Sequence, residues 1–153
     1  MEDFNVLNEV EFFEMIDKES YFKKELIQTI FVIKGSLKIL QNEHEIVLKS
    51  NDIFFPEPDK VYQLVEKSDN VRLLNLVLTK KILDTSIIDL SGKEYNHFFS
   101  PNRINVYNFN EQEFSSLVEL LLQLKLRLQE KSTKFVRYIQ YNLFYAIVYT
   151  AFS

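Results

Sequence analysis

The chain has 153 residues, which fits one domain with a small helical appendage. Its formal net charge is −4, and this argues against direct DNA binding because nucleic-acid-binding surfaces are usually basic. The absence of cysteine excludes disulfides and thiolate metal sites and fits a reducing cytoplasm. The N-terminal residues lack the apolar core of a signal peptide, and the apolar run at 143–149 is far shorter than the ~20 residues that span a bilayer. We therefore expect a cytoplasmic protein with no membrane association.

The first half of the chain has the period of β-structure. Residues 1–25 mix apolar and charged positions, and their pattern does not decide between a strand and a short helical turn. From residue 26 to residue 78, apolar and polar residues alternate in short segments, which predicts antiparallel strands. The expected elements are strands at 26–33 and 53–55, a hairpin that turns at 41–44, and a strand pair at 61–65 and 71–78.

The two remaining regions differ in character. Residues 79–109 are predicted to be irregular or to carry short strands. Asn110, followed three residues later by Glu113, is a helix N-cap with a capping-box-like partner, and the region to Leu128 contains no Gly or Pro. After a short polar break, a second helix is predicted from about Lys134.

Both predicted helices are apolar around more of their circumference than a single stripe requires. Left exposed, this surplus would form a larger apolar patch than soluble monomers usually carry. We therefore expect a homodimer that pairs through the helices. The expected interface residues are six of the leucines of the first helix: Leu117, Leu121, Leu122, Leu124, Leu126 and Leu128.

One stretch carries a family resemblance. Residues 28–64 contain, in order, a strand, Lys34-Gly35, a strand, a polar turn, a strand, Asn51-Asp52, an apolar run and a Pro-x-Pro. This order resembles the small cupin-like β-roll sensor domain of AraC-type bacterial transcription regulators, and the resemblance extends into the two helices. It implies a mainly β fold with C-terminal α-structure. A cupin-like antiparallel β-roll or barrel over residues 1–109 would be followed by a two-helix antiparallel hairpin over residues 110–153.

The resemblance also implies a function. Such a domain senses a small effector, such as a sugar or another metabolite, and dimerises through its helical hairpin. It contacts DNA only through a C-terminal helix-turn-helix unit, and these 153 residues contain no basic recognition helix. The alternatives are a cupin-type metal-dependent enzyme and a stand-alone cupin binding module without a DNA-binding partner.

Metal and catalytic chemistry find little support in the sequence. Metal-binding cupins place two histidines one residue apart on a strand, whereas the two histidines here, His44 and His97, are far apart in sequence. We interpret His44 as a turn residue and His97 as a packing or rim residue. A GxSxG motif is absent, and so is cysteine. We expect no bound metal, no cofactor, no catalytic residues and no enzyme activity.

Polar residues that share predicted strands with apolar ones are the candidates for ligand binding: Gln28, Gln63, Arg72 and Asn75. Arg72 has two interpretations. Its parity places it with Leu74 and Leu76, and an arginine on an inward face needs an ionic partner or an anionic ligand. Alternatively it lies at the edge of its strand and extends its charge into solvent, and we favour this second interpretation.

Overall fold

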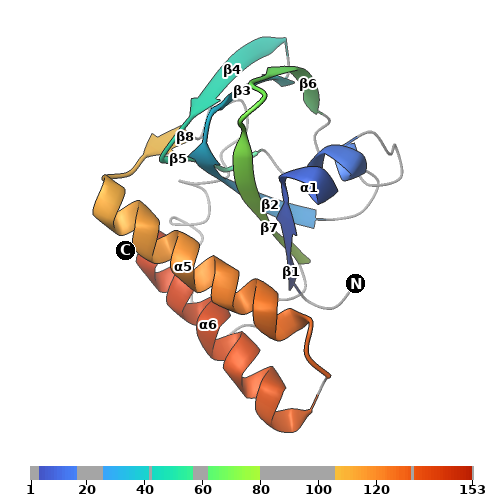
Figure 1. The fold of residues 1–153 in the computed structure, drawn as a ribbon, viewed down its shortest axis with the longest axis vertical. Coiled ribbons are helices and arrows are strands. Elements are labelled where there is room, and N and C mark those ends of the chain that lie inside the picture. The colour runs from blue at the N-terminus through green and yellow to red at the C-terminus, as the bar shows by residue number, and fades with distance from the viewer. Residues whose placement is uncertain are drawn as a thin grey trace. The chain divides into compact units, whose positions relative to one another are not determined.

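A computed structural model of the chain describes residues 4–16, 26–41, 43–56, 62–79, 106–131 and 133–152. The chain divides into two compact units, Met1–Phe109 and Asn110–Ser153, whose elements are labelled in Figure 1. Within the described ranges, no helix is long and apolar enough to cross a membrane. Of the predicted irregular region, residues 80–105 lie outside the described residues, and His97 is among them.

The strands of the first unit are β1 (Phe4–Asn8), β2 (Leu26–Lys34), β3 (Ser36–Gln41), β4 (His44–Lys49), β5 (Asp52–Phe54), β6 (Tyr62–Lys67), β7 (Arg72–Thr79) and β8 (Val106–Asn108). They form a five-stranded sheet in the order β1-β7-β2-β5-β8 and a three-stranded sheet in the order β4-β3-β6. All of the strand pairs among the described residues are antiparallel. The predicted antiparallel β-roll is confirmed, and its two sheets do not close into a barrel.

The N-terminal segment, whose pattern was ambiguous, contains a strand and a helix in succession. β1 is followed at once by α1 (Glu9–Ile16). Asn8 Oδ1 accepts a hydrogen bond of 2.9 Å from Glu11 N, and Glu11 Oε1 accepts one of 3.0 Å from Asn8 N. This reciprocal pair is a capping box with asparagine at the N-cap, and it marks the residue at which the strand ends and the helix begins.

The core of the roll lies between the two sheets and α1. Along β3 the buried residues are Leu37, Ile39 and Gln41, which alternate with more exposed positions as a half-buried strand requires. One apolar cluster joins both sheets to α1: Phe12, Ile16, Ile30, Val32, Leu37, Ile39, Ile46, Leu48, Phe54, Tyr62, Val71 and Leu73. Both sheets and α1 therefore contribute side chains to one apolar core.

A tight bend at Gly35 connects β2 to β3, where the glycine has a φ of 77°. A Cβ at this position would lie 2.9 Å from Val71 Cα and in closer contact with Ser68 Oγ. Because of the positive φ and the crowding, any residue other than glycine would destabilise the fold at this position. Gly35 therefore supplies the backbone conformation that this bend needs.

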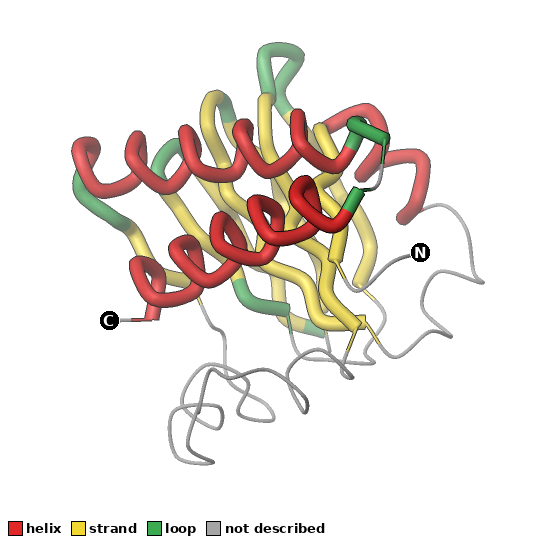
Figure 2. Tube along the Cα trace, turned by 90° about the horizontal axis from the view of Figure 1, so that it is seen from below, coloured by secondary structure: helices red, strands yellow, loops and turns green. Residues whose placement is uncertain are grey.

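The second unit consists of α5 (Glu111–Leu128) and α6 (Lys134–Phe152), which run side by side as a hairpin (Figure 2). Asn110 Oδ1 accepts a hydrogen bond of 2.8 Å from Glu113 N, which confirms the predicted N-cap. The buried face of α5 is formed by Phe114, Leu117, Leu121 and Leu124. These residues recur at three- and four-residue spacing, which places them on one side of the helix.

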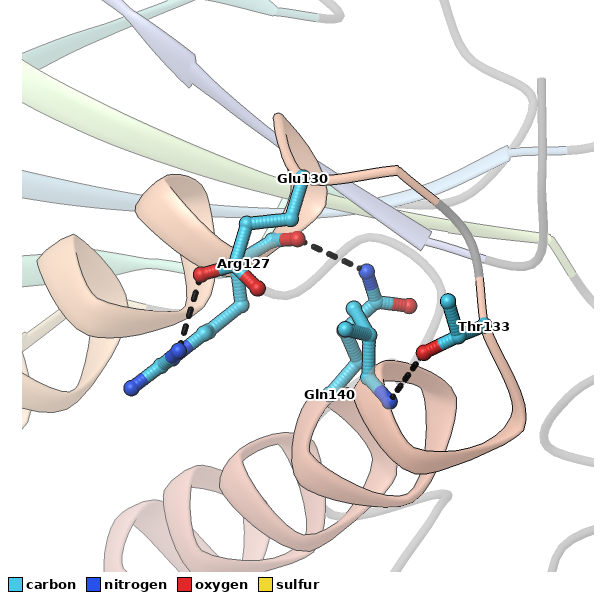
Figure 3. A network of polar contacts seen from close by, with 5 residues as sticks. Arg127, Glu130, Thr133 and Gln140 are labelled. Carbon is cyan, nitrogen blue, oxygen red and sulfur yellow. Dashed lines mark hydrogen bonds and ion pairs between the residues drawn. The ribbon is translucent and has the colours of Figure 1, made fainter.

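Polar contacts close the turn between the two helices (Figure 3). Gln140 of α6, which is only 4% exposed, donates through Nε2 a hydrogen bond of 2.9 Å to Arg127 O near the end of α5. Arg127 O also accepts a hydrogen bond of 3.2 Å from Glu130 N, so the Gln140 side chain is a second donor to this carbonyl at the helix end. Thr133 Oγ1 accepts a hydrogen bond of 3.1 Å from Val136 N and so caps the start of α6.

Candidate functional site

Three uncharged polar side chains meet inside the apolar roll. Tyr62 Oη donates a hydrogen bond of 2.6 Å to Gln28 Oε1, and Asn75 Nδ2 donates one of 3.1 Å to the same oxygen. All three side chains are buried. Because Tyr62 belongs to the three-stranded sheet and Gln28 to the five-stranded sheet, the first bond crosses the interior and links the two sheets.

Strand register explains why these residues face one another. In the β2–β7 pair, Gln28 lies opposite Val77 and Ile30 lies opposite Asn75. Gln28 and Asn75 are therefore diagonal neighbours on one face of the sheet, within reach of each other's side chains. That face also carries Ile30 and Leu73, which belong to the apolar core of the roll.

Aromatic contacts hold Tyr62 in position. Its ring stacks on Phe12 of α1, with centroids 6.4 Å apart and an interplanar angle of 21°. Phe12 is in turn packed against Phe13, with ring centroids 5.3 Å apart. The Nζ atom of Lys67 lies 4.1 Å from the centroid of the Phe13 ring on the outer side of this stack. The phenol at the centre of the roll is thus oriented by the N-terminal helix.

The structure brings together two of the four predicted ligand-binding residues. Gln28 and Asn75 are buried and share a hydrogen bond, whereas Gln63 and Arg72 are exposed. Arg72 occupies the first position of β7, opposite Lys34 of β2, so its charge lies at a sheet end, as the favoured interpretation expects. Gln63 follows Tyr62 on β6 and therefore points to the opposite face.

Sequence reasoning missed two residues of this interior, Tyr62 and Gln41. Tyr62 has the same parity as Leu64, which is less exposed than its neighbours Gln63 and Val65. Gln41 was assigned to the hairpin turn, although it shares the parity of Leu37 and Ile39 and is buried with them. A parity count along each strand would have identified both residues as facing inward.

The predicted dimer residues fall into two groups. Leu117, Leu121 and Leu124 are buried within the chain and so are not available to a second copy. Leu122 and Leu126 remain 49% and 60% exposed, and Leu128 is half-buried. The surface open to a partner is therefore narrower than the sequence predicts.

Few charged side chains are buried in the described part of the roll. Asp52 is the one buried ionisable carboxylate among the described residues, and its oxygens accept hydrogen bonds of 2.8 Å from Lys49 N and Asn108 Nδ2. The same residues include no group of three or more His, Asp or Glu that could hold a metal ion. His44 is exposed at the start of β4. Apart from Asp52, the buried polar side chains described in the roll are neutral amides and hydroxyls.

No family model and no curated protein matches the chain. Its fold is similar to that of the AraC-like transcriptional activator CuxR, with a TM-score of 0.54 at 9% sequence identity over 88% of this chain and 45% of that chain. Two structures of ToxT from Vibrio cholerae are less similar. An apo form has a TM-score of 0.48 at 13% identity, covering 79% of this chain and 45% of that chain. A complex with a naphthalenyl-substituted butenoic acid has a TM-score of 0.46 at 13% identity, covering 98% and 57%. The chain thus spans about half the length of these proteins, and the likeness to CuxR is one of fold.

Proposed function

We propose that this chain is the effector-sensing and dimerising domain of an AraC-type transcription regulator. The observation that carries the proposal is the buried group of Gln28, Tyr62 and Asn75. Apolar side chains are sufficient to fill the core of a small β-roll. Buried amide and phenol groups instead carry a desolvation cost, which their hydrogen bonds do no more than offset. Convergent polar groups in an apolar interior are the usual composition of a small-molecule site. The similarity of fold to CuxR supports the class of protein.

The proposed dimer forms through the second apolar stripe of α5. Leu122 and Leu126 lie four residues apart on one face, with the half-buried Val118 one turn before them. A two-fold pairing would bring this stripe against its copy, which is the commonest arrangement for a homodimer. The exposure of both leucines supports this assignment.

Effector binding would be coupled to the helical hairpin through β5 and β8, the strands that precede the hairpin or pair with the strand that precedes it. Phe109 N donates a hydrogen bond of 3.0 Å to Asn51 O, directly before the Asn110 N-cap. The Asp52–Asn108 bond fastens the same end of β8 to β5, which pairs in turn with β2. An effector that binds one arrangement of these strands better than another would shift the population of dimer geometries. An attached helix-turn-helix unit would convert that shift into altered DNA contacts.

The test is a fusion of the full 153-residue chain to a monomeric helix-turn-helix DNA-binding domain that represses a reporter only when dimerised. We expect the wild-type fusion to repress and the double variant L122K/L126K to lose repression. Val47→Lys is the matched control, because Val47 is 59% exposed on β4 of the roll, and it should repress like the wild type. Light scattering on the unfused proteins should show a dimer, except for the double variant.

Two results would contradict the proposal. One is a wild-type chain that is monomeric at micromolar concentration and does not repress. The other is an L122K/L126K variant that represses as well as the wild type. Circular dichroism on the double variant separates lost pairing from lost folding, because exposed leucines can be replaced without unfolding the roll.

A further inference from the structure

A groove opens at the surface of the roll, between α1 and the chain that leads from the end of β6 into β7. Its volume of about 530 Å³ is in the range of ligand-binding clefts. The described residues that line it all belong to the first unit. Gln28, Tyr62 and Asn75 are not among them, so the groove is separate from the buried polar group inside the roll.

Both walls of the groove contribute apolar side chains. Val10 of α1 is 61% exposed, and Phe13, one turn further along the same helix, is half-buried. Val71, which precedes β7, belongs to the other wall and is buried. Phe13 packs against the apolar core that includes Val71, so the fold holds this surface in place. The groove therefore presents a fixed apolar surface with one valine open to solvent.

Acidic side chains also line both walls. Glu9 and Glu14 belong to α1, and Asp69 belongs to the turn between β6 and β7. None of the three forms an ion pair within the described residues. Lys67 is the one basic residue in the described lining, so three carboxylates are balanced by one ammonium group. The groove therefore carries an excess of negative charge, which attracts a cationic partner.

Lys67 shows which kind of group the groove accepts. Its Nζ atom lies 4.1 Å from the centroid of the Phe13 ring, whose face attracts a cation electrostatically. Lys67 is exposed at the end of β6, and its long, flexible side chain can adopt other rotamers. A cation from a partner can therefore take the position of this ammonium group without a change in the backbone.

We propose that this groove docks a basic segment of a partner protein, with an arginine or lysine side chain over Phe13 and a neighbouring apolar side chain against Val10. The carboxylates of both walls attract such a segment, and the exposed apolar surface selects it over a free amine. Nucleic acid and other polyanions are repelled by the same carboxylates. The proposal goes beyond the function proposed above, because it requires neither an effector, nor a dimer, nor an attached DNA-binding unit.

The first test measures binding of a fluorescein-labelled hexapeptide of alternating arginine and leucine by fluorescence anisotropy. An arginine–serine hexapeptide of the same charge is the control probe. We expect the arginine–leucine peptide to bind the wild-type chain at micromolar concentration, more tightly than the control probe and more weakly in high salt. Absent binding, or equal binding of the two probes, would overturn the proposal. So would displacement of the labelled peptide by agmatine as effectively as by the unlabelled peptide, because the groove would then be a site for small amines.

The second test locates the site with charge-matched variants. Glu14→Gln combined with Asp69→Asn removes one carboxylate from each wall and should weaken peptide binding about fivefold. Glu45→Gln combined with Glu119→Gln removes two exposed carboxylates elsewhere and should weaken it by less than about twofold. Equal weakening by the two double variants would show a response to net charge alone and would overturn the proposal.

The third test removes the resident cation. Lys67→Met frees the face of Phe13 and should strengthen peptide binding about fivefold, whereas Lys49→Met makes the same change in net charge on β4 and should change it by less than about twofold. Weaker binding by Lys67→Met, or equal effects of the two variants, would overturn the proposal. Light scattering on Val10→Ser, with the similarly exposed Val47→Ser as its control, tests a second copy as the occupant. A change of oligomeric state in Val10→Ser alone would assign the groove to self-association and overturn the proposal.

Discussion

The roll and the helical hairpin both bury glutamine side chains, but for different reasons. In the hairpin, Gln140 Nε2 donates to Arg127 O, a carbonyl at the end of α5 that also accepts a hydrogen bond of 3.2 Å from Glu130 N. In the roll, Gln28 and Gln41 lie on strands whose backbone groups are paired by neighbouring strands. Gln28 Oε1 accepts hydrogen bonds from two side chains, Tyr62 and Asn75. The buried glutamine of the hairpin thus contacts the backbone at a helix end, whereas the described hydrogen bonds of Gln28 join side chains from both sheets of the roll.

The largest effect on the stability of the roll is expected from Gly35→Ala, at the bend between β2 and β3. Alanine would have to adopt the positive φ of this position, and its Cβ would crowd Val71 Cα and Ser68 Oγ. We therefore expect the free energy of unfolding to fall by about 3 kcal/mol. Urea denaturation followed by circular dichroism measures it. Ser36→Ala, at the next and exposed position, is the control and should change stability by less than ~0.5 kcal/mol. Equal stability of the two variants would show that the bend can relax.

An intermediate effect is expected from Tyr62→Phe, which removes the hydrogen bond between the two sheets and keeps the ring on Phe12. Gln28 Oε1 then keeps the bond from Asn75 and loses the shorter one, so we expect a loss of about 1–2 kcal/mol. Tyr138→Phe is the matched control, because this tyrosine is 60% exposed on α6. If both substitutions were neutral, the bond across the interior would contribute little to the roll.

The sequence predicts the strands and the N-cap because each depends on local chemistry. Gly35 stands at a position that tolerates only glycine, and Asn110 with Glu113 forms a pattern that recurs at helix starts. Alternating apolar residues likewise identify the inner face of β3. The roll and the hairpin are therefore recognisable before any coordinates are considered.

The candidate site is only half predictable, because it depends on register between strands that are distant in sequence. Gln28, Tyr62 and Asn75 meet through two strand pairings and a contact between sheets, and none of these follows from local pattern. Gln63 and Arg72 were selected as polar residues in apolar strands, although one has outward parity and the other lies at a strand end. Polarity within a strand is thus a weaker guide than polarity combined with parity.

The smallest effect is expected from the ion pair at the hairpin turn. Arg127 Nη1 lies 2.8 Å from Glu130 Oε1, and both side chains are more than a third exposed. Solvent and salt screen such a pair, and ordering two long side chains offsets part of the attraction. We expect Glu130→Ala to lower the free energy of unfolding by less than ~0.5 kcal/mol, with the difference from the wild type shrinking further in high salt.

This last substitution separates two explanations of the turn, since Arg127 takes part in both of its contacts. If Gln140 holds the turn through Arg127 O, losing Glu130 leaves that bond intact, and Gln140→Met remains the more destabilising change by a clear margin. Urea denaturation of the two single variants and the double variant, at low and high salt, measures the margin and any coupling between them. A loss for Glu130→Ala equal to that for Gln140→Met at low salt would instead make the exposed ion pair the main support. In that case the hydrogen bond from Gln140 to Arg127 O would not be what stabilises the hairpin turn.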